Sequence, residues 1–151
     1  MKTLRIYVDT SVFGGCFDEE FQEESRMLFE EIKRGKFRLV ISSMTIDELT
    51  EAPEHVQKVL TELLPEHIEM IEFSNEIGEL RDEYLKTVLG PAHRADAEHI
   101  ASASVAEVDL VVSWNFKQIV HYDKIAGFHA VNLLKGYKPV NIYSPKEVVE
   151  K

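Results

Sequence analysis

Hydrophobic and polar positions follow two patterns along the chain, short apolar runs and longer stretches with helical spacing. The short runs are rich in β-branched residues and predict strands at about 4–9, 37–41, 68–71, 109–113 and 140–143. Between them, the spacing of apolar residues predicts helices at about 18–34, 44–51, 54–64, 74–89, 93–107 and 117–135. Strands that alternate with helices favour an α/β fold: one parallel sheet of about five strands, flanked by helices.

Glycine, proline and serine residues mark where the predicted elements end. Gly35 ends the first helix, Gly90 and Pro91 break the chain after another, and Ser144 followed by Pro145 is typical of the start of a final helix. No repeat, low-complexity tract or linker interrupts the pattern. We therefore expect residues 1–151 to form a single domain.

Composition narrows the class of protein and its compartment. Of 151 residues, 44% are apolar and 29% are charged, which is typical of a globular domain. No apolar run approaches the roughly 20 residues of a membrane span, and Asp9 comes too early for a signal peptide. The single cysteine, Cys16, cannot form an internal disulfide. We expect a cytoplasmic protein without membrane contact.

Charge is distributed unevenly between the two parts of the chain. The net charge is −10, with a balance of −11 over residues 1–83 and +1 over residues 84–151. Such a protein does not attract phosphate backbones by its overall charge. Nucleic-acid binding would need a local site or bound cations, and Arg94, Lys117 and Lys124 are candidates for contacts with phosphates.

Polar side chains lie at the predicted carboxyl ends of two strands, where ligands of parallel sheets bind. Asp9 ends the first strand, and Ser113 and Asn115 follow the fourth. Glu48 lies just after the second strand, although its spacing from Thr45 is also typical of a helix cap. These positions are consistent either with a site or with ordinary turns and caps.

The helix predicted at 93–107 carries an acid on an apolar face. Asp96 shares that face with Ile100 and Ala103, and a buried carboxylate is costly unless a cation or donor compensates it. Glu98 lies about 200° around the helix from Asp96, from 100° per residue, and we expect it to face solvent. His99 is one turn from Asp96, where it could orient that acid or pack in the core.

Four segments resemble, in order and spacing, the PIN domain, the fold of the VapC-type toxin nucleases. They are Val8-Asp9-Thr10-Ser11, the acid of Ile46-Asp47-Glu48-Leu49, Asp96-Ala97-Glu98-His99-Ile100-Ala101 and Val111-Val112-Ser113-Trp114-Asn115-Phe116, and together they span nearly the whole chain. The resemblance implies an α/β/α sandwich that cleaves RNA with a bound metal ion. It also implies an antitoxin partner and a homodimer.

The resemblance assigns a role to each matched residue. Asp9, Glu48 and Asp96 take the places of the catalytic and metal-binding acids, and Ser11 and Ser113 are assigned to substrate binding. Asn115 stands where the family often has a fourth acid, and its amide oxygen can bind a metal without adding charge. Oxygen ligands suit Mg²⁺ or Mn²⁺, which activates water and neutralises charge during phosphodiester hydrolysis.

Two other hypotheses about the function remain open from the sequence. Asn115 in place of an acid favours a non-catalytic PIN-like module, binding RNA or regulatory, with a degenerate metal site. The second reading is a phosphohydrolase or phosphoacceptor domain in which Asp9 is the nucleophile. Haloacid-dehalogenase-like enzymes have a second acid two residues further on, where this chain has Ser11.

Overall fold

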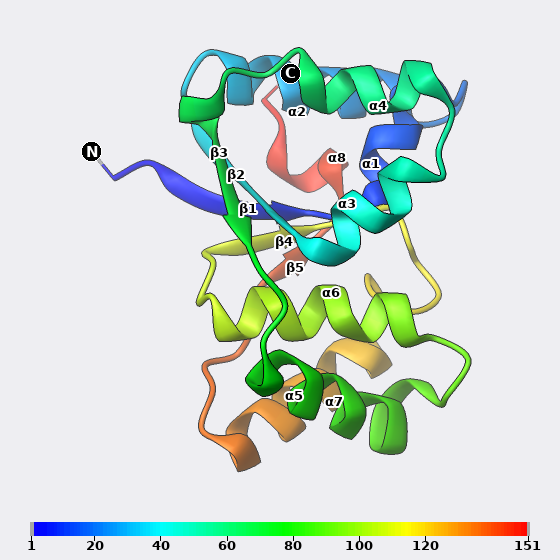
Figure 1. Cartoon of the computed structure of the whole chain (residues 1–151), viewed down its shortest axis with the longest axis vertical. Helices are drawn as coiled ribbons and strands as arrows, with labels where there is room; N and C mark the ends of the chain where they lie inside the picture. Colours follow the sequence, from blue (N-terminus) through cyan, green and yellow to red (C-terminus); the bar gives the residue numbers. More distant parts are fainter. Residues whose placement is uncertain (1, 151) are drawn as a thin grey trace.

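Five parallel strands form one sheet at the centre of the protein, of which the computed structural model describes residues 2–150. The strands lie in the order β3-β2-β1-β4-β5 (Figure 1), and each neighbouring pair is parallel. Their bounds are β1 Leu4–Val8, β2 Phe37–Ser42, β3 Ile68–Ile71, β4 Leu110–Val112 and β5 Ile142–Tyr143. The predicted α/β fold is therefore confirmed, with β1 as the central strand.

Helices connect the strands, and two of them begin at the expected capping residues, Ser74 and Ser144. The Ser74 hydroxyl accepts a hydrogen bond from the Ile77 amide, and Ser144 forms a capping box with Glu147. A π-helical turn at 85–89 follows α5. The helices are α1 Thr10–Gly15, α2 Gln22–Lys33, α3 Ser43–Thr50, α4 Glu54–Thr61, α5 Asn75–Tyr84, α6 Arg94–Val105, α7 Tyr122–Lys135 and α8 Pro145–Val148.

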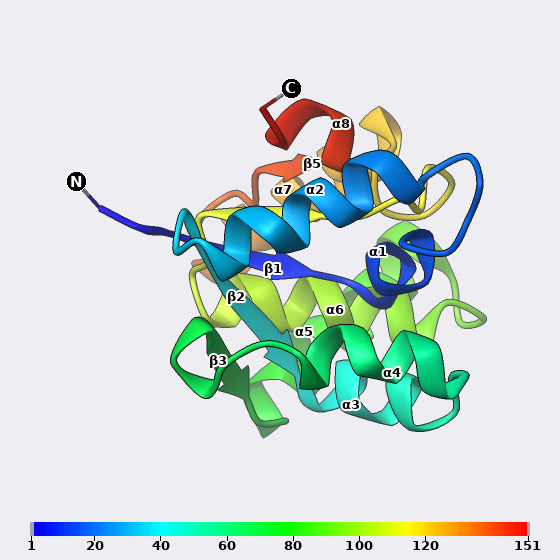
Figure 2. The ribbon, with the colours of Figure 1, turned by 90° about the horizontal axis from the view of Figure 1, so that it is seen from above.

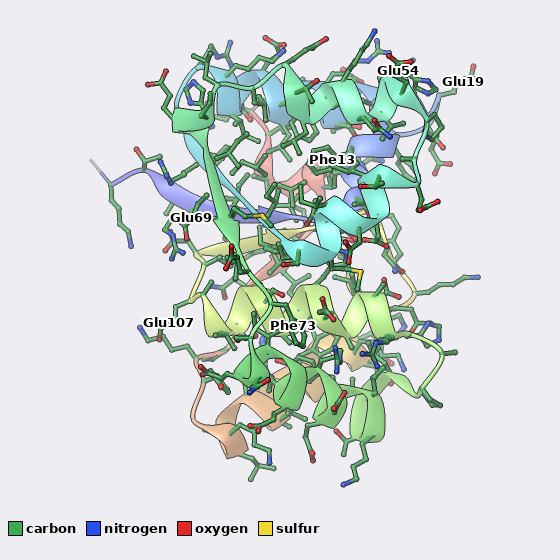
Figure 3. The ribbon with its side chains drawn as sticks, viewed as in Figure 1. Phe13, Glu19, Glu54, Glu69, Phe73 and Glu107 are labelled. Atoms are coloured by element: carbon green, nitrogen blue, oxygen red, sulfur yellow. The ribbon has the colours of Figure 1, made fainter. Side chains whose placement is uncertain are left out.

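Each face of the sheet has its own hydrophobic core, because successive strand residues point to opposite faces. Ile6 and Val8 of β1 pack with α1, α2 and α4, whereas Tyr7 packs with α5, α6 and α7. Figures 1 and 2 show these two groups of helices on opposite sides of the strands. In Figure 3, Phe13 lies inside the layer formed by α1, α2 and α4, and Glu19 and Glu54 lie at the outer edge of that layer. The sheet is thus enclosed on both faces.

The structure differs from the sequence prediction at two connections. Residues 10–15, for which no helix was predicted, form the short helix α1, and the following helix starts at Gln22 rather than near residue 18. The helix expected from residue 117 begins at Tyr122 and continues through Gly127 without interruption. Both of these connections lie beside the candidate site.

Within residues 2–150, no helix combines the length and the apolarity needed to cross a membrane.

Candidate active site

The carboxyl ends of β1 and β4 bring Asp9 together with two serines. The Ser11 hydroxyl donates to Asp9 Oδ1 over 2.6 Å, and the Ser113 hydroxyl donates to Asp9 Oδ2 over 2.9 Å. Asp9 is only 4% exposed, and burial raises its pKa above the ordinary value of an aspartate. Both carboxylate oxygens are therefore held in place, which disfavours Asp9 as a nucleophile that must approach a phosphorus atom.

Each of these serine hydroxyls also accepts a backbone hydrogen bond. The Trp114 amide donates to Ser11 Oγ and the Asn115 amide donates to Ser113 Oγ, each over 2.9 Å. The two hydroxyls thus tie Asp9 to the chain that follows β4. The predicted contact of Ser11 and Ser113 with substrate stays a prediction, because in this structure their protons are used to hold the acid.

Glu48 reaches the same edge of the sheet from α3. The capping box of that helix is formed by Ser42 and Thr45, so Glu48 is not part of the cap that its spacing suggested. Its Oε1 atom accepts hydrogen bonds from the Thr10 hydroxyl over 2.9 Å and from His99 Nε2 over 2.5 Å. Its side chain is 34% exposed. Burial alone would raise the pKa of Glu48. The hydrogen bonds from His99 and Thr10, together with the charge of His99, lower it instead.

His99 links Glu48 to the buried centre of the sheet. Its Nδ1 atom lies 2.5 Å from the hydroxyl of Tyr7, which in turn lies 2.6 Å from Ser42 Oγ. Burial lowers the pKa of His99, and the interactions with Tyr7, Glu48 and Asp9 more than offset this, so its pKa lies well above the ordinary value. The sequence left two roles open for His99, orienting Asp96 or packing in the core; the structure buries it and gives it Glu48 as its hydrogen-bond partner on the site side.

Asp96 and Asn115 contact each other beside these residues. Asn115 Nδ2 donates to Asp96 Oδ1 over 3.2 Å. Asn115 Oδ1, the predicted metal-binding atom, accepts the backbone amides of Lys117 and Gln118 and so closes the turn after β4. Burial and the nearby negative charge of Glu48 raise the pKa of Asp96. Asn115 thus contacts Asp96 with its donor side toward the acid, and its role as a metal ligand stays a prediction.

The three acids come from three different elements and influence one another electrostatically. Asp96 raises the pKa of Asp9, Glu48 raises that of Asp96, and His99 opposes both effects. Carboxylate oxygens are the ligands that Mg²⁺ and Mn²⁺ prefer, so the donor chemistry fits a hard cation. Over residues 2–150, however, no group of three His, Cys, Asp or Glu side chains has the geometry to hold a metal ion. The chemistry fits the ion, but a preformed three-ligand centre is not present.

The structure corrects the prediction for Glu98. Its side chain is buried rather than solvated, and its Oε1 atom lies 2.9 Å from Arg81 Nη1 in an ion pair between α6 and α5. Trp114 is also buried, with its Nε1 donating to Ser25, and it stacks on Phe21 at a centroid distance of 4.3 Å. Trp114 is therefore a core residue.

The remaining residues to place are the candidate phosphate-binding cations and Cys16. Arg94 and Lys117 are exposed, and Lys124 Nζ donates to the Val88 carbonyl oxygen. Burial raises the pKa of Cys16 to about 11, so its thiol is protonated at neutral pH and has little nucleophilic character. These features leave Asp9, Glu48 and Asp96 as the centre of the candidate active site.

The structure is similar to those of several bacterial toxin–antitoxin proteins, although no protein-family model and no curated sequence matches the chain. FitAcB from Neisseria gonorrhoeae has a TM-score of 0.59 and 17% identity, over 95% of this chain and 99% of that one. Mycobacterium tuberculosis VapC20, a Sarcin-Ricin loop cleaving toxin, has a TM-score of 0.58 and 14% identity, over 74% and 91%. VapBC2 from Rickettsia felis, bound to a DNA fragment from its promoter, has a TM-score of 0.56 and 16% identity, over 93% and 98%.

These similarities define the fold of the chain. It is the α/β/α fold of VapC-type toxins, and it extends over almost the whole length of both proteins in two of the three comparisons. The resemblance inferred from the four sequence segments is confirmed at this level. Because each identity is below 20%, the role of the site must be argued from its own residues.

Proposed function

We propose that this protein is a metal-dependent endoribonuclease, the toxin of a toxin–antitoxin pair, that hydrolyses RNA phosphodiesters. The observation that supports this most directly is the position of Asp9, Glu48 and Asp96. Asp9 follows β1, Glu48 lies on α3 and Asp96 on α6; all three lie near the carboxyl edge of the sheet, where Asp96 raises the pKa of Asp9 and Glu48 raises that of Asp96. Separate elements that gather costly carboxylates at one point are typical of a catalytic site.

Asp9, Glu48 and Asp96 would hold Mg²⁺ or Mn²⁺, with Asn115 as a further, uncharged neighbour. When bound, such an ion lowers the pKa of an attacking water and neutralises charge that develops on the phosphate. Ser11 and Ser113 fix the orientation of Asp9, and Glu48 keeps its Oε2 atom free of hydrogen bonds to residues 2–150. Arg94 and Lys117 are exposed cations for the RNA backbone.

The partners follow from the same proposal. VapBC2 is described as bound to a DNA fragment from "their promoter", wording that refers to more than one protein, and this supports an antitoxin partner for this chain. RNA as substrate is supported by the description of VapC20 as a toxin that cleaves the Sarcin-Ricin loop. We further propose that the protein acts in the cytoplasm and as a homodimer.

The test is RNA cleavage by the purified protein across a Mg²⁺ and Mn²⁺ titration, with EDTA as the metal-free arm. Asp9→Asn and Asp96→Asn should each reduce the rate at least a hundredfold, because each removes a ligand charge. Both variants should stay folded, and without metal their stability should be equal or higher, since one repelling charge is gone. Asp47→Asn, an exposed aspartate next to Glu48, is the matched control and should leave the rate unchanged.

A second function, a non-catalytic PIN-like module, is supported by Asn115 in place of an acid and by the absence of a three-ligand geometry within residues 2–150. The same experiment separates the two. A wild-type protein that binds RNA but does not cleave it at any Mg²⁺ or Mn²⁺ concentration would establish the non-catalytic function. An Asp96→Asn variant that unfolds would show instead that this acid is structural.

A further inference from the structure

A chain of buried hydrogen bonds leads from the interior of the sheet to the carboxylate of Glu48. It consists of Ser42 Oγ, Tyr7 OH, the two ring nitrogens of His99, and Glu48 Oε1, with successive distances of 2.6, 2.5 and 2.5 Å. We call these four residues the site network. Its members come from β2, β1, α6 and α3, so one network joins four elements of the fold.

The inner part of the site network is held rigidly. Tyr7 is fully buried in the central strand and His99 is 1% exposed on α6. A buried imidazole is costly unless both of its nitrogens have partners, and here Nδ1 contacts Tyr7 and Nε2 contacts Glu48. The ring therefore has one favourable orientation, and Nε2 points out of the core toward the site.

The outer part of the site network would be mobile without this support. Glu48 lies on α3 with a side chain that is 34% exposed, and an unsupported glutamate of this kind samples many rotamers. His99 Nε2 and the Thr10 hydroxyl both donate to the same oxygen, Oε1. Within residues 2–150, Oε2 receives no hydrogen bond. One oxygen is thus held by the protein, and the other has no hydrogen-bond partner among the described residues.

We propose that His99 is a positioning residue for the nuclease reaction, which holds Glu48 in the orientation that presents Oε2. This inference rests on the proposed function. It adds a residue that acts without contacting metal or RNA. A histidine that only filled the core would not need to place a ring nitrogen on a partly exposed carboxylate. Partners of this type behind a metal-binding carboxylate typically change affinity or activity by about 10–100-fold.

Two substitutions of His99 separate positioning from packing. The amide nitrogen of Gln can take the place of Nε2, so His99→Gln keeps a donor for Glu48. The shorter His99→Asn can take the place of Nδ1 and contact Tyr7, but it cannot reach Glu48. Both variants lose the imidazole ring, so both should lower the midpoint of thermal unfolding to a similar extent.

We expect the two variants to differ in function. His99→Asn should lower kcat for RNA cleavage and the affinity for Mn²⁺ measured by calorimetry, one or both by roughly 10–100-fold, with KM for RNA unchanged. His99→Gln should stay within about twofold of the wild type, because it keeps a donor for the Glu48 contact. In a Glu48→Gln background, His99→Asn should cause no further loss of Mn²⁺ affinity, because its effect passes through Glu48.

The outcomes that contradict the proposal are distinct from those that contradict the function. Equal losses in both variants, in step with their thermal stability, would mean that His99 is structural. A wild-type protein that neither binds Mn²⁺ nor cleaves RNA would overturn the nuclease function together with this role. If both His99 variants fail to fold, Tyr7→Phe decides the question, because it keeps the imidazole ring. A selective loss of kcat in Tyr7→Phe supports positioning, and an unchanged kcat overturns it.

Discussion

Two buried hydrogen-bond networks lie on the same side of the sheet, and each is centred on a fully buried tyrosine. Tyr7 belongs to the site network, whereas Tyr84 belongs to what we call the closed network, formed by Tyr84, Ser104 and Asn132 of α5, α6 and α7. In the closed network, the Tyr84 hydroxyl donates to Asn132 Oδ1, and Asn132 Nδ2 donates to Ser104 Oγ and to the Lys138 carbonyl oxygen, each over 3.0 Å.

The difference between the networks lies in where they end. Each member of the closed network is neutral and at most 3% exposed, and its hydrogen bonds return to the core. The site network ends on the charged, partly exposed carboxylate of Glu48. A closed neutral network stabilises a fold, and a buried network that ends on an exposed charge supports chemistry at the surface. Matched substitutions can therefore lower stability in both networks, but only those in the site network should also lower activity.

The largest effect is expected for Asn132→Asp in the closed network. The new carboxylate cannot donate to Ser104 or to the Lys138 carbonyl oxygen, and it has no cation beside it among its hydrogen-bond partners. We expect a loss of about 3 kcal/mol in the free energy of unfolding, measured with urea. Cleavage per folded molecule and the Mg²⁺ requirement should not change. A variant as stable as the wild type would show that the closed network is not structural.

The same substitution at the site, Asn115→Asp, should act on the metal instead. It places a carboxylate where Asn115 Nδ2 now donates to Asp96, so without metal the two acids repel each other. With Mg²⁺, an added charge at about 4 Å contributes up to about 4 kcal/mol per unit cation charge before desolvation. We expect half-maximal cleavage at a Mg²⁺ concentration at least tenfold lower, equivalent to about 1.4 kcal/mol. An unchanged requirement would mean that residue 115 does not face the ion.

The smallest effect compares Tyr7→Phe with Tyr84→Phe, each of which removes one buried hydroxyl. Both should lower the free energy of unfolding by about 1–2 kcal/mol, because each leaves buried partners without a hydrogen bond. Only Tyr7→Phe should also lower kcat, by about threefold, since it loosens His99. Urea unfolding and steady-state cleavage measure the two quantities. Equal activity in both variants would remove the functional distinction between the two tyrosines.

The sequence predicted those features of the fold and the site that depend on a local pattern of residues. Asp9, Ser113 and Asn115 follow buried strands, so their position at the edge of a parallel sheet could be predicted. The helix α1 could not, because six residues that include Gly14 and Gly15 carry no helical pattern. The role of His99 depends on Tyr7, which lies 92 positions away in the chain, and no spacing rule connects the two.

Glu98 shows a second limit of the helical pattern. A position about 200° from a buried residue faces solvent only when a helix has one covered side. Helix α6 lies between the sheet and α5 and is buried at each position from 97 to 104, so its outer side is covered as well. Arg81 of α5 supplies the charge that makes a buried Glu98 tolerable. The sequence pattern of one helix cannot reveal the neighbour that covers it.

The central position of β1 has a consequence for protein synthesis. Asp9 precedes its partner Ser113 by 104 positions, and β1 has no pairing with β4 until residues 110–112 have been synthesised. An unfinished chain therefore has β1, β2 and Glu48 but neither Asp96 nor the hydroxyl that completes the cradle of Asp9. Because non-local contacts form last during folding, the site around Asp9 is completed only after β4 has been synthesised.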